Sequence, residues 1–134
     1  MKFCYITKDF IEIAVDPQKV AIIGEDETLT WQAFKTRSDD FCRQFEMNGF
    51  ANSYTPVLVY GHKSVNMIVA FYSLMRLNIP YIPADIIYPL KRIQKIVAFS
   101  KTTVIINTTQ TSLGLKGCNE LFFQKDSFQL NSQH

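Results

Sequence analysis

PVLVYGHKSVNMIVAFYSLMRL, residues 56–77, carries the clearest fold signal in the sequence. It opens with Pro56–Tyr60, which is apolar on both faces of an extended chain and is typical of a strand in a sheet covered by helices on both sides. A turn follows at Gly61–Ser64, and its last residue is of a type that caps helices. From Val65 to Leu77 the chain is apolar on nearly every side, which predicts a buried helix. Phe71 is expected in the core of the domain, so that Phe71→Asp should unfold the protein.

The residues that follow continue this alternation of strands and helices. Residues 81–83 predict a very short extended piece between two prolines. A helix is predicted to begin with Pro89 at its first position and to end near Ser100. Residues 103–106 predict the next buried strand, so the class is α/β, with a mostly parallel sheet flanked by helices. The predicted inward residues of the helix are Ile93, Ile96 and Val97, and the outward ones are Lys91, Arg92 and Lys95.

The residues that precede residue 56 predict a helix, a hairpin and a second helix. The first helix is expected at about Tyr5–Val15, because Pro17 disfavours helical geometry just before it. Val20–Gly24 and Thr28–Trp31 predict two short strands around a charged turn. Thr30 also predicts the cap of the second helix, which is expected to end near Gly49. Its predicted inward stripe is Phe34, Ser38, Phe41, Cys42 and Phe45.

Composition excludes several classes of protein. The chain has 134 residues, which is one domain or part of one. Its 14 basic and 12 acidic residues give a net charge of +2, too small to predict nucleic acid or a membrane surface as partner. The three cysteines, Cys4, Cys42 and Cys118, form no disulfide framework, which predicts a reducing, cytoplasmic setting. The longest apolar segment, residues 65–77, is shorter than the ~20 residues that a membrane span needs.

No motif in the sequence predicts a catalytic, cofactor-binding or metal-binding residue. The five glycines form neither GxGxxG nor GxxxxGK[ST], and Gly114–Gly117 is more simply an ordinary loop than an RNA-binding GxxG loop. His62 lacks the neighbouring ligands of a metal site, and Asp39-Asp40 is more simply a solvated helix face.

Several local phrases nevertheless resemble the N-terminal end of the adenylate-forming enzymes, which include acyl-CoA synthetases and peptide-synthetase adenylation domains. Leu29–Phe34 is similar to the family's first signature, and LMRLNIPYIPAD, residues 74–85, to its second. Val59–His62 is most similar to the D-alanine–carrier-protein ligases. The resemblance covers roughly Phe10–Asn107 and implies a scaffold role for the matched residues. These are Leu29, Thr30, Trp31, Tyr60, Gly61, His62, Tyr81, Pro83, Asp85 and Arg92.

The resemblance implies part of an enzyme that joins ATP and a carboxylate, here an amino acid such as D-alanine, into an acyl-adenylate. The family's phosphate loop, ribose-binding aspartate and C-terminal lysine have no counterpart in this sequence. The chain is therefore expected to be an N-terminal fragment or subunit that is not catalytic alone. ATP, Mg²⁺ and a carrier protein are expected only for a complete enzyme. Residues 1–107 would be the partial adenylation subdomain, and 108–134 a weakly patterned extension with a strand at 121–123.

Two other hypotheses remain open at this point. The chain could be a stand-alone remnant that serves as a protein-interaction or regulatory module, or an unrelated small α/β binding domain. A piece cut from a larger sheet leaves a strand edge and apolar helix faces uncovered. The first hypothesis therefore predicts self-association or a complementary chain that carries the rest of the domain. One departure from the family is Leu77-Asn78, where the family usually has Ala-Gly.

Overall fold

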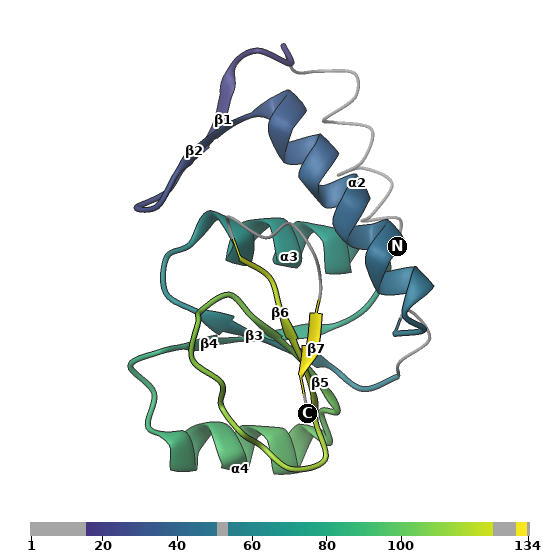
Figure 1. The fold of residues 1–134 in the computed structure, drawn as a ribbon, viewed down its shortest axis with the longest axis vertical. Helices are drawn as coiled ribbons and strands as arrows, with labels where there is room; N and C mark the ends of the chain where they lie inside the picture. The colour runs from purple at the N-terminus through teal and green to yellow at the C-terminus, as the bar shows by residue number, and fades with distance from the viewer. Residues whose placement is uncertain (1–15, 51–53, 125–130, 134) are drawn as a thin grey trace.

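The protein is built on a five-stranded sheet with helices on both faces (Figure 1). The computed structural model describes residues 16–50, 54–124 and 131–133, so the predicted helix at Tyr5–Val15 lies outside the described residues. The strand order is β4-β3-β5-β6-β7, in which the first four strands are parallel and β7 is antiparallel to β6. The strands are β3 (Val57–Gly61), β4 (Tyr81–Asp85), β5 (Val104–Asn107), β6 (Asn119–Phe122) and β7 (Asn131–Gln133).

The two faces of the sheet have separate cores, as the apolar strands predict. Helices α2 (Trp31–Met47) and α3 (Val65–Arg76) lie over one face, and α4 (Leu90–Ser100) lies over the other (Figure 1). In β3, Val57 and Val59 belong to the core beneath α2 and α3, whereas Leu58 packs with Ile93 of α4. Ile105 of β5 joins Leu58 in the second core. The predicted α/β class and the burial of both strand faces are confirmed.

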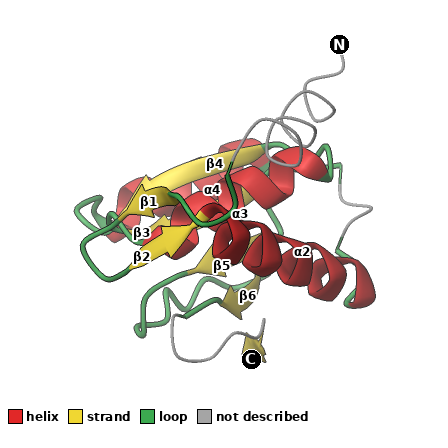
Figure 2. Ribbon diagram, turned by 90° about the horizontal axis from the view of Figure 1, so that it is seen from above, coloured by secondary structure: helices red, strands yellow, loops and turns green. Residues whose placement is uncertain are grey.

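A small hairpin lies beside the main sheet. Strands β1 (Val20–Ile23) and β2 (Thr28–Thr30) are antiparallel, and they lead directly into α2. Figures 1 and 2 both place the hairpin at the end of the molecule where α3 begins. Thr30 caps α2 as predicted, because its Oγ1 accepts a hydrogen bond from the Ala33 amide at 3.1 Å. Trp31 is the first residue of α2 and not the end of a strand, since Thr30 already occupies the cap.

The end of α3 explains the departure at Asn78. The Ile79 amide donates to the Leu74 carbonyl at 2.9 Å, and the Asn78 amide donates to the Met75 carbonyl at 3.1 Å. These two bonds define a Schellman motif, which requires a left-handed residue after the helix. Asn78 has a φ of 61°, so asparagine adopts the conformation for which glycine is the usual choice.

Two of the predicted boundaries are wrong around β4 and α4. The strand β4 has five residues instead of three, and it pairs with β3 from Tyr81 to Asp85 without interruption. The prolines did not end it, because β4 is an edge strand and Pro83 needs no amide on its open side. Pro89 is the N-cap of α4, with an extended ψ of 148°, so the helix begins one residue later, at Leu90.

Candidate functional site

An open apolar groove of about 500 Å³ lies at the end of the molecule where β3 and β4 finish. Three elements form its walls: the hairpin, the N-terminal half of α3, and the end of β4 with Tyr88 behind it. Its volume falls in the range of about 300–1,000 Å³ that is usual for binding pockets. The apolar residues that line it are Ile22, Ile23, Val65, Met67, Ile68, Phe71, Pro83, Ala84 and Tyr88, and the others are Gly24, Lys63, Ser64 and Asp85.

The hairpin wall is tied to α3 by charged side chains of its turn. Asp26 Oδ1 accepts a hydrogen bond from the Val65 amide at 3.2 Å, which places a carboxylate at the N-terminus of α3. Glu27 accepts two hydrogen bonds from the Arg37 guanidinium, at 2.5 and 3.0 Å. The same guanidinium donates to Asn66 Oδ1 at 3.0 Å, so α2, α3 and the hairpin share one polar network.

The helical wall carries apolar side chains that the sheet does not cover. Ile68 is 42% exposed, and Phe71 is only half-buried. Phe71 stacks on Tyr81 of β4, with ring centroids 4.8 Å apart and planes 14° from parallel. The expectation that Phe71 lies inside the core is corrected in degree, because the side chain is partly buried and packs against the edge of the core beneath α2 and α3. The helix is apolar on nearly every side because it presents a second apolar face to the groove.

A histidine and a carboxylate meet at the rim of the groove. Gly61 and Asp85 are partners in the strand register, which brings His62 beside Asp85. His62 Nδ1 lies 3.0 and 3.1 Å from the two oxygens of Asp85. The Ile87 amide donates to Asp85 Oδ1 at 3.0 Å, and this bond, followed by the one from His62, lowers the pKa of the carboxyl group. Asp85 thus fixes the turn that follows β4.

The crevice between β3 and β5 is closed by protein atoms. The strand order reverses there, and such a reversal is the usual ligand site of open α/β sheets. A Cβ added to Gly61 would lie 2.0 Å from Thr108 Oγ1, so the threonine already fills the space. Thr108 Oγ1 donates to the Tyr60 carbonyl at 3.0 Å and accepts from Ser64 Oγ at 3.2 Å.

The loop Gly114–Gly117 lines a second cavity of about 350 Å³, whose floor is a carboxylate. Glu120 is 6% exposed. It accepts hydrogen bonds from Asn107 Nδ2 at 2.6 Å, the Leu113 amide at 2.9 Å and Ser112 Oγ at 2.6 Å. A carboxylate beneath this loop repels phosphate, and Asp26 already occupies the N-terminus of α3.

The described cysteines are poor nucleophiles. Burial raises the pKa of the Cys42 thiol, which lies between α2 and α3 and donates to the Ser73 carbonyl. Burial also raises the pKa of Cys118, with a further contribution from nearby Glu120. Neither thiol is in an environment that favours the reactive thiolate.

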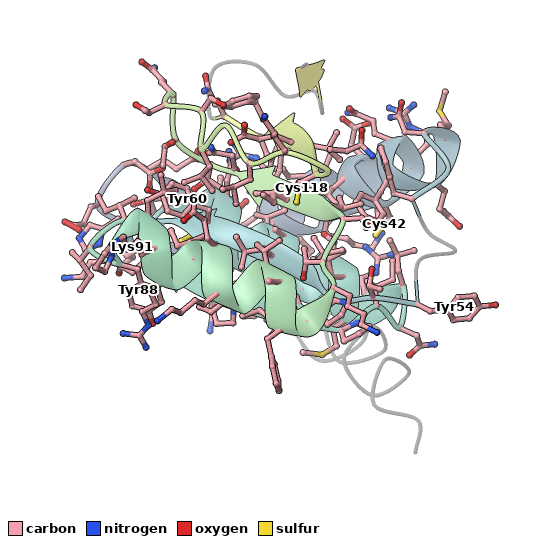
Figure 3. The ribbon with its side chains drawn as sticks, turned by 90° about the horizontal axis from the view of Figure 1, so that it is seen from below. Cys42, Tyr54, Tyr60, Tyr88, Lys91 and Cys118 are labelled. Atoms are coloured by element: carbon pink, nitrogen blue, oxygen red, sulfur yellow. The ribbon has the colours of Figure 1, made fainter. Side chains whose placement is uncertain are left out.

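The sequence-predicted scaffold residues form two groups, and two of them, Tyr81 and Arg92, lie apart from both. Tyr60, Gly61, His62, Pro83 and Asp85 lie together at the ends of β3 and β4, and Leu29, Thr30 and Trp31 lie at the junction of the hairpin and α2. Tyr81 starts β4, and Arg92 lies on α4 with its guanidinium 4.1 Å from the centre of the Tyr88 ring. Figure 3 places Tyr60, Tyr88 and Lys91 at one end of the molecule and Tyr54 at the other.

Sequence reasoning missed the residues that build the groove. Ile68 and Phe71 are three positions apart, so they share one side of α3. Because the helix is apolar all round, its sequence pattern does not distinguish this groove-facing side from the side that faces the core. Asp26 and Arg37 were indistinguishable from ordinary solvated charges. In the described part of the chain, no three His, Cys, Asp or Glu side chains gather as a metal site would require. No helix in that part has the length and apolar character to cross a bilayer.

Fold and site together define an α/β segment whose mostly parallel sheet is covered by helices on both faces and which carries an apolar groove at one end. The AMP-binding enzyme family matches residues 11–129, and the chain belongs to this family. A D-alanine–D-alanyl carrier protein ligase of Bacillus licheniformis is 31% identical over 97 residues, which cover 72% of this chain and 19% of the relative. An L-proline–[L-prolyl-carrier protein] ligase of Pseudomonas fluorescens is 26% identical over 92 residues, 69% of this chain and 18% of the relative.

Solved structures show the same fold. The N-terminal subdomain of Klebsiella oxytoca NpsA has a TM-score of 0.75 at 16% identity, and the match covers 87% of this chain and 30% of that one. The crystal structure of CmiS6 has a TM-score of 0.77 at 16% identity and covers 95% and 32%. The chain spans about a fifth of the length of the curated relatives it matches.

Proposed function

We propose that this chain is the N-terminal part, as fragment or subunit, of an ATP-dependent ligase that activates an amino acid as its adenylate. Two coverages carry the proposal. The family match extends over most of this chain, but the matched region is only about a fifth of each curated relative. Two of these relatives are named for different amino acids, D-alanine and L-proline. The 31% identity and the phrase Val59–His62 favour D-alanine as the substrate.

We further propose that the chain is not catalytic alone. Three positions that suit phosphate in α/β folds are taken by the protein itself: the start of α3 by Asp26, the β3–β5 crevice by Thr108, and the loop cavity by Glu120. The remaining part of the enzyme would then hold ATP and Mg²⁺ and meet the carrier protein. The division of the chain at residue 107 and its cytoplasmic location stay predictions.

Amino-acid-dependent exchange of pyrophosphate into ATP tests this proposal. The purified chain should catalyse no exchange with D-alanine, L-alanine or L-proline. The chain extended by the reading frame that follows the His134 codon should exchange with D-alanine in preference to the other two. Exchange by the purified chain alone would overturn the non-catalytic assignment, and preference for another amino acid would overturn only the substrate.

A second candidate is a stand-alone remnant that serves as a protein-interaction or regulatory module. The exposed groove favours it, since large uncovered apolar patches mark interaction sites. Sequencing the DNA after the His134 codon separates the two. A frame that encodes a Ser/Thr/Gly-rich phosphate loop supports the ligase, and absence of such a frame nearby supports the module.

A further inference from the structure

Exposed apolar residues concentrate at one end of the molecule. The described part of the chain has nine large hydrophobic side chains in the exposed class, and five of them lie at or beside the groove. Ile23 and Ile87 are 79% and 75% exposed, at the hairpin and after β4 respectively. The five residues, here called the apolar rim, are Ile23, Ile68, Ile86, Ile87 and Leu90.

Hydrogen bonds hold the apolar rim in place. The hairpin is anchored by the contact of Asp26 with the start of α3. The turn that carries Ile86 and Ile87 is anchored by Asp85, whose side chain accepts from the Ile87 amide and whose carbonyl accepts from the Tyr88 amide at 3.0 Å. A rigid apolar surface loses little conformational entropy when it is covered, which favours binding.

The adjacent sheet edge is unsuited to pairing with another strand. β4 is the edge strand, and Pro83 in its middle lacks the amide that an added strand would need. An occupant of the groove must therefore insert side chains between the hairpin, α3 and the β4–α4 turn. This disfavours a second copy that docks edge to edge.

We propose that the groove and the apolar rim are the docking surface for the part of the adenylate-forming fold that this chain lacks. This inference rests on the proposed function. The chain matches 19% of the Bacillus licheniformis ligase, so the rest of the domain to which this segment belongs lies in the remaining sequence and must share its apolar core. The surroundings of the rim are basic at the β3–α3 turn and on α4, where Lys63, Lys91 and Arg92 are exposed, and acidic on the hairpin, where Glu25 and Asp26 are exposed. The occupant is an apolar segment with carboxylates on the α4 side and a basic group on the hairpin side.

Direct binding tests the surface, with the Bacillus licheniformis ligase lacking its matched segment as the probe. Affinity is measured by titration for the wild-type chain and for Ile68→Glu, Ile87→Glu and Phe99→Glu. Phe99 is the matched control, because it is 93% exposed near the far end of α4. The two rim variants should bind at least about tenfold more weakly, and Phe99→Glu should bind like wild type. Circular dichroism checks folding, and Ile87→Glu carries the test if Ile68→Glu unfolds.

Each other outcome overturns the inference in a distinguishable way. Binding that the rim variants leave unchanged overturns the surface and leaves the proposed function standing. No binding, with self-association of the wild-type chain that Ile68→Glu abolishes, replaces the occupant by a second copy. No binding to a probe that circular dichroism shows to be folded, by a chain that stays monomeric in light scattering, overturns the docking surface, and the pyrophosphate-exchange test decides the proposed ligase separately.

Discussion

Arg37 should contribute far more to stability than a typical surface arginine. Its side chain is 16% exposed and that of its partner Glu27 is 11% exposed, so the ion pair is mostly shielded from water. Arg37→Met keeps the length of the side chain but leaves Glu27 and Asn66 Oδ1 without this donor. Removing one partner of a buried pair costs about 3–5 kcal/mol, and the residual exposure reduces this to about 2–4 kcal/mol.

Urea unfolding of the purified chain measures this cost. With an m-value of about 2 kcal/mol per molar, the midpoint should fall by roughly 1–2 M. Arg43→Met is the control on the same helix, because Arg43 pairs with Asp40 but is 59% exposed, and it should cost about 0–1 kcal/mol.

The double variant Glu27→Gln, Arg37→Met should recover part of the loss, since no buried carboxylate is then left unpaired. Hydrogen exchange of the Gly24 amide, which donates to the Glu27 carbonyl in the hairpin turn, should accelerate in Arg37→Met. Equal costs for Arg37→Met and Arg43→Met would refute the reasoning that this network fixes the hairpin wall of the groove.

Three further changes test the packing and electrostatics around the groove. Phe71→Asp should lower the melting temperature without abolishing the folded state, because Phe71 is half-buried. Val69→Asp, at a position with no exposed surface, should unfold the protein. An unfolded Phe71→Asp variant would place Phe71 in the core after all. Gly61→Ala should lower the free energy of unfolding by about 1–3 kcal/mol, because the added methyl group meets the Thr108 side chain. Adding Thr108→Ala should restore part of this loss in chemical unfolding. If it restores none, Thr108 is not what opposes the methyl group. The pKa of Asp85 is lower in the folded state, so its contribution to the free energy of unfolding is present above the ordinary pKa of about 3.9 and is lost as the pH falls below that value. Urea unfolding between pH 6 and 3 should therefore show a weaker pH dependence of stability for Asp85→Asn than for the wild-type chain. An unchanged pH dependence would contradict the assigned shift.

The sheet could be predicted because its signal is local. Val57, Leu58 and Val59 are all fully buried, and a strand that is apolar on both faces can bury both only inside a sheet that is covered on each side. The cap at Thr30 and the stop at Asn78 were equally readable, since each depends on residues within one turn of a helix.

The groove could not be predicted because its parts are distant in sequence. Arg37 and Asn66 are 29 positions apart, and Asp26 and Val65 are 39 apart. A carboxylate that caps a remote helix has the same local pattern as one that is merely solvated. The strand predicted at 121–123 corresponds to β6, which spans Asn119–Phe122, and the weak pattern around it shifted the predicted start because its partner in register is the distant β5. Strand β7 (Asn131–Gln133) was not predicted at all.

Under the proposed function, the surface left for the rest of the enzyme concentrates at one end, which carries five of the nine exposed large hydrophobic side chains of the described residues. The other four are Val20, Met47, Tyr54 and Phe99. Both sheet faces have their own cores, and in the described residues no buried side-chain nitrogen or oxygen lacks a hydrogen-bond partner. A segment cut from a larger fold at random would leave such defects along several faces. Here the apolar rim lies at the end where the parallel strands finish, the end that carries ligand sites in α/β sheets. Whatever completes this fold therefore meets it beside the strand ends, so completion of the core and assembly of any nucleotide site would be the same event. Substitutions at the opposite end, such as at Tyr54 with 99% exposure, should leave both unaffected.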